Sequence, residues 1–325
     1  MTLERRTMLG GLLVAASGAS SAPAQSSGLE AWPTRPVEIV VPYAAGGPAD
    51  RYARAFGVRL AEVWRQPVVI VARPGGAAAI GAAAVANAPP DGHSLLLGST
   101  GMVTNQLLLR NMPYTPAALS PLALVAFGGG IFFVHPSVPA RTAKELQDYG
   151  KANPGALKFG SSGIGATPHL AAELFAMRAG IEITHIPYRG TAPALTDLLA
   201  GHINAMYDSA TSIRHVQEGK IRAIASSGPI RNRVTPDVPT MIESGFDVEI
   251  RTFYSFFSPT AAPVALRRKI EADFLAVASS GEIQEMFLQD GLDPEAMTSD
   301  AFGRFLTVEL TKWSEVFRAA NIAAQ

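Results

Sequence analysis

The chain has 325 residues, of which 48% are hydrophobic and 17% are charged, and its formal net charge is zero. A chain of this length can bury a sizeable core and favours two domains. The balanced charge argues against a nucleic-acid partner, because proteins that bind nucleic acid usually carry a basic excess. The absence of cysteine excludes disulfide bonds, thiolate metal sites and cysteine nucleophiles.

The N-terminus has the layout of a bacterial secretory signal. Arg5 and Arg6 precede an apolar run over residues 8–16, and small residues follow up to Ala24. The apolar run is shorter than the roughly 20 residues that a membrane-spanning helix needs. We therefore expect a signal peptide over residues 1–24 and a mature protein in the periplasm. The paired arginines leave both the general secretory route and the twin-arginine route open.

Strands and helices alternate in the first part of the mature chain. This alternation predicts a parallel sheet with right-handed crossovers. The expected strands cover residues 37–41, 68–71 and 94–97, and the expected helices cover residues 50–64 and 80–88.

A second α/β block begins with a strand at residues 131–134. Its first helix, residues 142–153, starts with Thr142 as N-cap and Glu145 three positions later, which is the pattern of a capping box. Further strands are expected at residues 157–159, 183–186, 205–207 and 221–225, and further helices at residues 168–178, 192–200 and 209–218.

The last part of the chain returns to the first block. An apolar and aromatic strand at residues 251–258 precedes three helices, at residues 263–278, 281–289 and 299–321. We therefore expect an α/β fold with two lobes. Residues 32–130 together with 257–325 form the first lobe, and residues 131–256 form the second. Two crossings between lobes would make a hinge, which suits closure around a ligand.

Two glycine-containing loops each join a strand to a helix. Loop one covers residues 43–50, and loop two covers residues 160–167. The start of a helix has unpaired backbone N–H groups and the positive end of the helix dipole, so both loops could bind an anion. A structural interpretation competes with this one, in which the glycines only permit tight turns and Asp50 only caps a helix. The pair of loops predicts two lobes that grip one anionic small molecule.

Support for catalysis or metal binding is weak. Gly92-His93-Ser94 begins like a hydrolase nucleophile elbow, but Leu96 stands where the closing glycine should be. The six histidines have no metal-ligand spacing, and His169, beside loop two, is the one for which a functional role competes with helix capping. We expect no cofactor, no metal and no enzymatic activity. A secreted serine hydrolase that uses Ser94 or Ser161 stays as a remote alternative.

Several motifs occur in a fixed order along the mature chain. They lie at residues 35–50, 73–81, 90–92, 160–175, 185–198 and 236–240, and include His185-Ile186-Pro187-Tyr188-Arg189-Gly190. This ordered set resembles the tripartite tricarboxylate transporter receptors, the TctC or Bug family of extracytoplasmic solute-binding proteins. The resemblance implies a two-lobed periplasmic binding protein fold of type II with the ligand cleft between the lobes. It also implies a small carboxylate ligand, membrane transporter subunits as partners and a monomeric receptor.

The resemblance also implies which residues bind the ligand. Loop one would contribute Tyr43, Ala45, Gly46, Gly47 and Asp50, and loop two would contribute Ser161, Ser162, Gly163 and Thr167. Ser99 and Asp208 would line the cleft from strand ends, where open α/β sheets bind ligands, and Ala79 completes the set.

One segment departs from the family pattern. Gly76-Ala77-Ala78 stands where the family usually has Ala-Gly-Gly, so the resemblance does not define the shape of the cleft at this point. The sequence also leaves the biological role open, because a sensory receptor with the same clamp would have the same features.

Overall fold

The computed structural model describes residues 32–319. The chain forms two units, Met1–Trp32 and Pro33–Gln325. The expected signal peptide, residues 1–24, lies outside the described residues. The helices and strands described below all belong to the second unit, and none of its described helices has the length and apolar character to cross a membrane.

The first of two sheets has six strands in the order β11-β4-β10-β3-β1-β2. Strand β1 pairs in parallel with β2 and β3, which confirms the parallel arrangement expected for this block. Strands β10, β4 and β11 complete the sheet in antiparallel pairs. The strands are β1 (Val37–Val41), β2 (Val68–Ala72), β3 (Ser94–Gly98), β4 (Leu119–Gly129), β10 (Arg251–Pro259) and β11 (Asp293–Met297).

The second sheet has five strands in the order β7-β6-β8-β5-β9. Here β6 pairs in parallel with β7 and β8, while β5 pairs antiparallel with β8 and β9. The strands are β5 (Ile131–Val134), β6 (Leu157–Ser161), β7 (Ile183–Pro187), β8 (Ala205–Asp208) and β9 (Arg222–Ser226). The interior strand β5 is apolar and buried at every position, as expected for a strand covered by helices on both faces.

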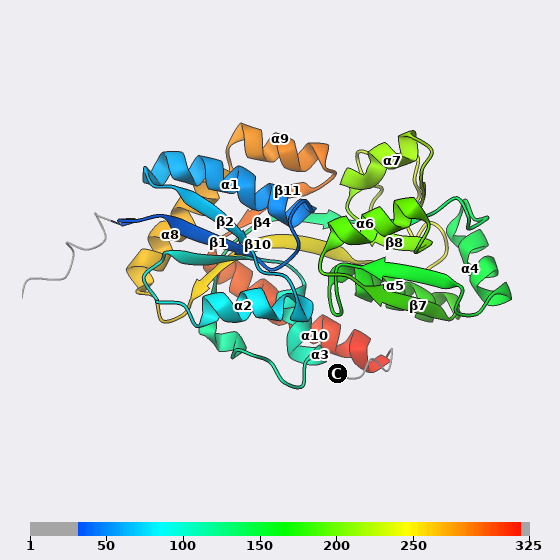
Figure 1. Cartoon of the computed structure of the whole chain (residues 1–325), viewed down its shortest axis with the longest axis horizontal. Coiled ribbons are helices and arrows are strands. Elements are labelled where there is room, and N and C mark those ends of the chain that lie inside the picture. Colours follow the sequence, from blue (N-terminus) through cyan, green and yellow to red (C-terminus); the bar gives the residue numbers. More distant parts are fainter. Residues whose placement is uncertain (1–31, 320–325) are drawn as a thin grey trace, which may run out of the picture. The chain divides into compact units, whose positions relative to one another are not determined.

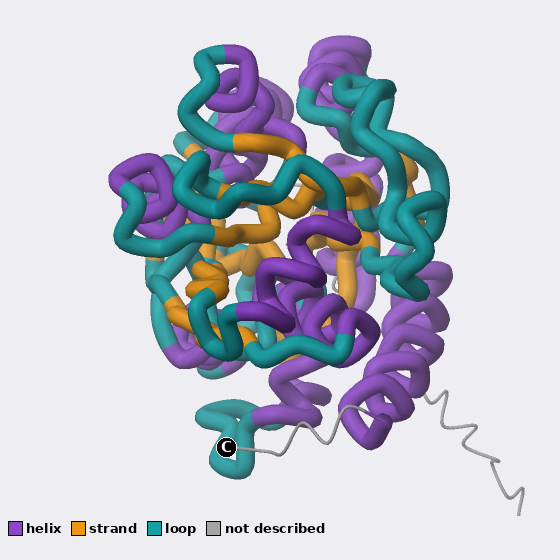
Figure 2. The backbone as a smooth tube through the Cα atoms, turned by 90° about the vertical axis from the view of Figure 1, so that its right-hand side faces the viewer, coloured by secondary structure: helices purple, strands orange, loops and turns teal. Residues whose placement is uncertain are grey.

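Helices cover both sheets. Around the first sheet, α1 lies above the strands and α2 below them, and α5 and α6 lie on opposite sides of the second sheet (Figure 1). A tube view shows the strands in the interior, surrounded by helices and loops (Figure 2). The helices are α1 (Pro48–Trp64), α2 (Ala79–Ala86), α3 (Gly101–Leu108), α4 (Ala143–Ala152), α5 (Thr167–Ala179), α6 (Thr191–Ala200), α7 (Ile213–Gln217), α8 (Val264–Ala278), α9 (Gly281–Gln289) and α10 (Ser299–Ala319), with short 3-10 turns η1 (Gly76–Ala78), η2 (Pro116–Ala118) and η3 (Ala210–Ser212).

Local sequence signals explain several of these elements. The Thr142 side chain accepts a hydrogen bond from the Glu145 N–H, and the Glu145 carboxylate accepts one from the Arg141 N–H, so the expected cap of α4 is confirmed. An aromatic cluster fixes α1 and α8 on the first sheet. Phe56, Phe256 and Phe274 are fully buried in it, with ring centroids of Phe256 and Phe274 4.2 Å apart.

The chain passes between the two sheets more than once. It leaves β4 at Gly129 and enters β5 at Ile131, and it returns after β9 through the long segment that leads to β10. Strand β10 spans the expected lobe boundary at residues 256 and 257, and it pairs with β3 and β4 over its length. The exact lobe boundaries stay a prediction.

Candidate functional site

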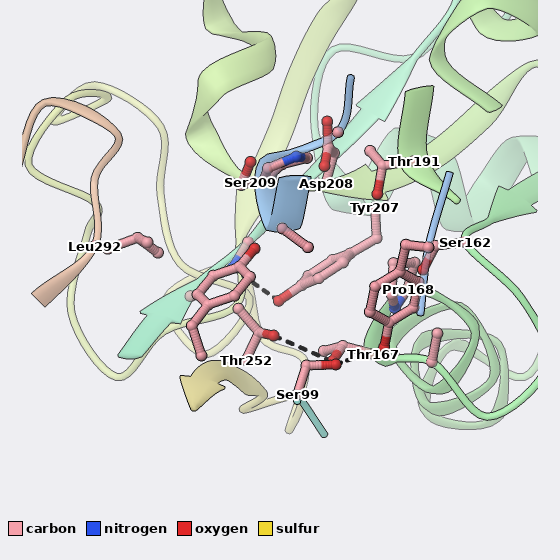
Figure 3. A pocket seen from close by; sticks show the side chains of 18 of the residues that line it. Ser99, Ser162, Thr167, Pro168, Thr191, Tyr207, Asp208, Ser209, Thr252 and Leu292 are labelled. Carbon is pink, nitrogen blue, oxygen red and sulfur yellow. Dashed lines mark hydrogen bonds between the residues drawn. The ribbon is translucent and has the colours of Figure 1, made fainter. Parts of the chain in front are cut away.

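A cleft lies where the loops of the two sheets meet, and its empty space, counted with the part open to solvent, is about 660 Å³. The walls come from the loop after β1, the end of β3, the passage from β4 to β5, the starts of α5 and α6, the end of β8, and β10. Figure 3 shows the side chains that line the cleft.

Three helices begin at this cleft. Pro48 and Ala49 of α1, Thr167 and Pro168 of α5, and Thr191 of α6 all line it. No side chain caps the N-terminus of any of these three helices. The first N–H groups of a helix have no partner within the helix, and the helix dipole makes this end positive. The cleft is therefore suited to a negatively charged group.

Asp208 is the one formally charged side chain among the described residues that line the cleft. It ends β8, and only 5% of its surface is exposed. The Ser212 hydroxyl donates a hydrogen bond of 2.5 Å to its carboxylate. Burial raises the pKa of Asp208 to about 6, although hydrogen bonds from the Ser212 hydroxyl and the Ser209 N–H act to lower it.

Neutral hydroxyl groups form much of the remaining wall. The hydroxyls of Tyr43 and Ser99 are 2.6 Å apart and share a hydrogen bond, and Thr167 donates a longer one, 3.4 Å, to Thr252 (Figure 3). The Tyr207 hydroxyl accepts a hydrogen bond from the Gly130 N–H at 2.7 Å. Burial raises the pKa of Tyr207 to about 12, so its hydroxyl is uncharged at neutral pH.

Half of the expected ligand-binding residues line the cleft. They come from both loops and from two strand ends, as expected, and they are Tyr43, Gly47, Ser99, Ser162, Thr167 and Asp208. The other expected residues lie in or beside the same loops without lining the cleft, and they are Ala45, Gly46, Asp50, Ala79, Ser161 and Gly163. Which of all these residues contact a ligand stays a prediction.

Asp50 holds the shape of loop one. Its carboxylate accepts hydrogen bonds from the Gly46 N–H at 3.1 Å and from Arg54 at 3.0 Å. Although burial acts to raise its pKa, these hydrogen bonds keep the pKa of Asp50 below its ordinary value. Asp50 thus ties the turn to the first turn of α1. This role is structural, but it differs from the helix cap considered above, because Gly46 precedes the helix. Gly46 has a φ of 86°, while Ala45 is exposed.

Ser161 and two histidines support loop two from within. The Ser161 hydroxyl accepts a hydrogen bond from the Gly163 N–H and lies 2.6 Å from Nε2 of His185. The His185 ring stacks on His169, whose Nδ1 accepts a hydrogen bond from the Gly165 N–H. Burial, with His169 nearby, lowers the pKa of His185 to about 4. Because Ser161 is fully buried, a substrate could not reach its hydroxyl, which argues against a hydrolase.

The segment that departs from the family pattern lies next to loop two. Ala77 and Ala78 have φ angles of 56° and 75°, in the left-handed region. Asn105 donates a hydrogen bond to the Ala77 carbonyl. A second hollow, lined by residues 74–78, 162–164 and 187–189 among others, separates this segment from loop two, and Gly163 lines it. Ala79 is buried at the start of α2.

Sequence reasoning missed several residues of the cleft, of which Thr191, Ser209, Thr252, Tyr254 and Leu292 are examples. Thr191 could have been found, because it follows Gly190 after β7 and opens a helix, as in loops one and two. Ser209 is adjacent to Asp208 in the sequence. Nothing in the local sequence marks Thr252, Tyr254 or Leu292, which depend on how β10 and the segment before β11 are placed.

Comparisons with known proteins show the same fold in solved structures. The model of the family described as tripartite tricarboxylate transporter family receptor matches residues 52–322. Three similar solved structures are Rpa4515 of R. palustris with adipate, the periplasmic binding protein BugD, and MatC of Rhodopseudomonas palustris with bound malate. The first two are 32% and 31% identical, each with a TM-score of 0.87 over 90% of this chain and 100% of theirs. MatC is 25% identical, with a TM-score of 0.82 over 88% of this chain and 99% of its own.

Proposed function

Since the chain belongs to the tripartite tricarboxylate transporter receptor family, we propose that it captures a small carboxylate in the periplasm and presents it to the membrane subunits of such a transporter. As a member of a receptor family with the two-lobed periplasmic binding protein fold, the protein binds a solute and is not an enzyme. This agrees with the expectation from the sequence. Export by residues 1–24 and a monomeric state are parts of the same proposal.

One observation carries the proposal of an anionic ligand. Three helices without side-chain caps begin at one cleft, and no lysine, arginine or histidine lines it within the described part of the chain. A ligand anion would then be held by backbone N–H groups and hydroxyls. A carboxylate is the favoured anion because two similar structures contain adipate and malate.

The residues that line the cleft have separate parts in this proposal. Gly47 and Ser162 would bring backbone N–H groups close to the ligand, and Thr167 and the Tyr43–Ser99 pair would offer hydroxyls. Ala45, Gly46, Asp50, Ser161 and Gly163 would shape the two loops, and Ala79 would support the neighbouring segment.

A thermal-shift measurement tests the proposal. The protein purified after export is unfolded and refolded to remove any ligand, and is then heated with adipate, malate or the corresponding diamides. A ligand at a hundred times its dissociation constant adds about 2.7 kcal/mol to stability. We expect at least one acid to raise the melting temperature and its diamide to leave it unchanged. Equal shifts for acid and diamide would contradict an anion clamp, and no shift with either acid would contradict this ligand class.

A further inference from the structure

Asp208 has an unusual position for a carboxylate. It lies at the end of β8 in the wall of a cleft that three helix N-termini make attractive to anions. In Figure 3 it lies close to Thr191 and Ser209, above the Tyr207 ring. A carboxylate here competes with a ligand anion for the same positive field.

No cation neutralises Asp208 within the described residues. Two tyrosines, Tyr207 on its own strand and Tyr254 on β10, lie close enough for the charge of Asp208 to raise their pKa values. On α7, Arg214 donates a hydrogen bond to His215, which in turn lies 3.3 Å from the Glu218 carboxylate. Both side chains are therefore directed to partners other than Asp208.

Within residues 32–319, the other elements around the cleft place no lysine, arginine or histidine in its lining. Arg189, in the loop before α6, is exposed and lines another hollow. On α5, His169 faces the Gly165 N–H and the His185 ring. On α1, Arg54 pairs with Asp50 at 3.0 Å. The first turn of α6 and strand β5 contain no titratable side chain.

Two carboxylates that lie side by side without a cation repel each other unless a proton is shared between them. We propose, on the basis of the function proposed above, that Asp208 meets the bound ligand as a neutral carboxylic acid that donates a hydrogen bond to a ligand carboxylate. Binding is then accompanied by the uptake of one proton from solvent, which forms the O–H bond of Asp208. A proton from solvent, and not a cation, then removes the repulsion between the two carboxylates.

The electrostatics of the cleft agree with this proposal. Burial already raises the pKa of Asp208 to about 6. A ligand anion beside it raises the pKa further, because a like charge disfavours ionisation. Above pH 6 the free protein has lost this proton and must regain it on binding. The affinity therefore falls as pH rises from 6, by up to about tenfold per pH unit, until the pKa of the complex is passed.

Calorimetry with adipate and malate tests the proposal. Each acid is titrated into the wild-type protein from pH 6 to pH 8, in buffers that differ in ionisation enthalpy, so that proton uptake is measured directly. We expect up to one proton taken up per ligand and an affinity that falls with pH. Asp208→Asn keeps the shape and a neutral N–H donor, so its affinity should be independent of pH, exceed that of the wild type at pH 8, and involve no proton uptake.

The possible outcomes separate the two proposals. Binding of an acid by the wild type without proton uptake overturns the role of Asp208 and leaves the carboxylate receptor intact. Weaker binding by Asp208→Asn at every pH also overturns it, because the ionised carboxylate would then be the required form. Failure of both acids to bind at any pH overturns the proposed ligand class. The wild-type proton count decides the question even if the variant does not fold.

Discussion

Ala77 and Ala78 have backbone conformations that glycine adopts more easily. Their φ angles of 56° and 75° lie in the left-handed region, where a β-carbon crowds the following carbonyl. They stand where the family usually has glycine, so the chain carries a local strain beside loop two. The Cα of Ala77 is near the position that a β-carbon on Gly163 would take, at 3.9 Å, so a change here is close to loop two.

Replacing Ala77 with glycine should stabilise the protein. A non-glycine residue in the left-handed region costs about 1–2 kcal/mol. Against this, glycine lowers the free energy of unfolding by about 0.4–1 kcal/mol, because it has more conformational freedom in the unfolded chain. We expect a net gain of up to about 1.6 kcal/mol in the free energy of unfolding, measured with denaturant. Ala83→Gly, inside α2, is the control and should lose about 1 kcal/mol. A lower free energy of unfolding in both variants would show that the backbone of Ala77 is not strained.

At the scale of single residues, only part of the site could be predicted from the sequence. Tyr43, Ser99 and Asp208 follow strands that are plain in the sequence, so their place at the edges of the sheets could be predicted. Within each loop, however, a one-residue difference decides whether a side chain faces the cleft or the interior. Ser161 and Ser162 show this, because Ser162 lines the cleft and Ser161 faces His185. No pattern in the loop distinguishes them.

At the scale of elements, the starts of α1, α5 and α6 form the site more than any side chain does. Each follows a strand and a glycine-containing turn, so each brings its N-terminus to the carboxyl edge of a sheet. Two of these junctions were identified as loops one and two. The third, at Gly190, has the same form, and its helix was predicted without its place in the cleft.

A negative charge at the start of α6 should imitate the ligand. In Thr191→Asp the new carboxylate lies at the first position of the helix, where the dipole favours it, so the melting temperature should be unchanged or higher. It also repels an anion in the cleft. We expect the affinity for adipate, measured by calorimetry, to fall on the order of tenfold or more.

Thr196→Asp is the matched control for this change. Thr196 lies on the exposed side of the same helix, so the same substitution there should leave the affinity for adipate nearly unchanged. Equal affinities in Thr191→Asp and the wild type would show that the start of α6 does not face the ligand.

Most strands and helices could be predicted, and those that were missed have a physical reason. Strand β11 has the sequence Asp-Pro-Glu-Ala-Met, without β-branched residues or alternation, and it exists because it pairs with β4 at the edge of the sheet, where proline is tolerated. Helix α3 was missed because its eight residues include glycine, threonine and asparagine. The predicted helix over residues 209–218 is wrong in its extent, since a 3-10 turn, η3, precedes a short α7.

At the scale of the whole unit, residues 33–325, the loops of the two sheets touch each other directly across the cleft. The Ala44 N–H of loop one donates a hydrogen bond of 2.7 Å to the Arg189 carbonyl, which follows β7. The Thr104 hydroxyl of α3 donates one of 2.6 Å to the Gly165 carbonyl of loop two. A ligand in the cleft would be enclosed by these contacts, so its affinity depends on whether the loops can approach this closely.

Gly190 is the residue that permits the first of these contacts. It has a φ of 148°, and a β-carbon at this position would lie 2.8 Å from the Ala44 nitrogen. In Gly190→Ala, Ala44 and Arg189 must separate, so the closed arrangement becomes less populated. Each loss of about 1.4 kcal/mol in that equilibrium lowers the apparent affinity about tenfold. We expect the affinity for adipate to fall by on the order of tenfold, measured by calorimetry.

Gly219→Ala separates this effect from the cost of a backbone conformation that alanine dislikes. Gly219 has a φ of 72°, and a β-carbon there would meet nothing within 4 Å. This control should lose stability while keeping the affinity for adipate, whereas Gly190→Ala should lose affinity in addition. If both variants bind adipate as the wild type does, the contact between Ala44 and Arg189 does not contribute to enclosing the ligand. If both lose affinity equally, the effect comes from backbone strain and not from the approach of the two loops.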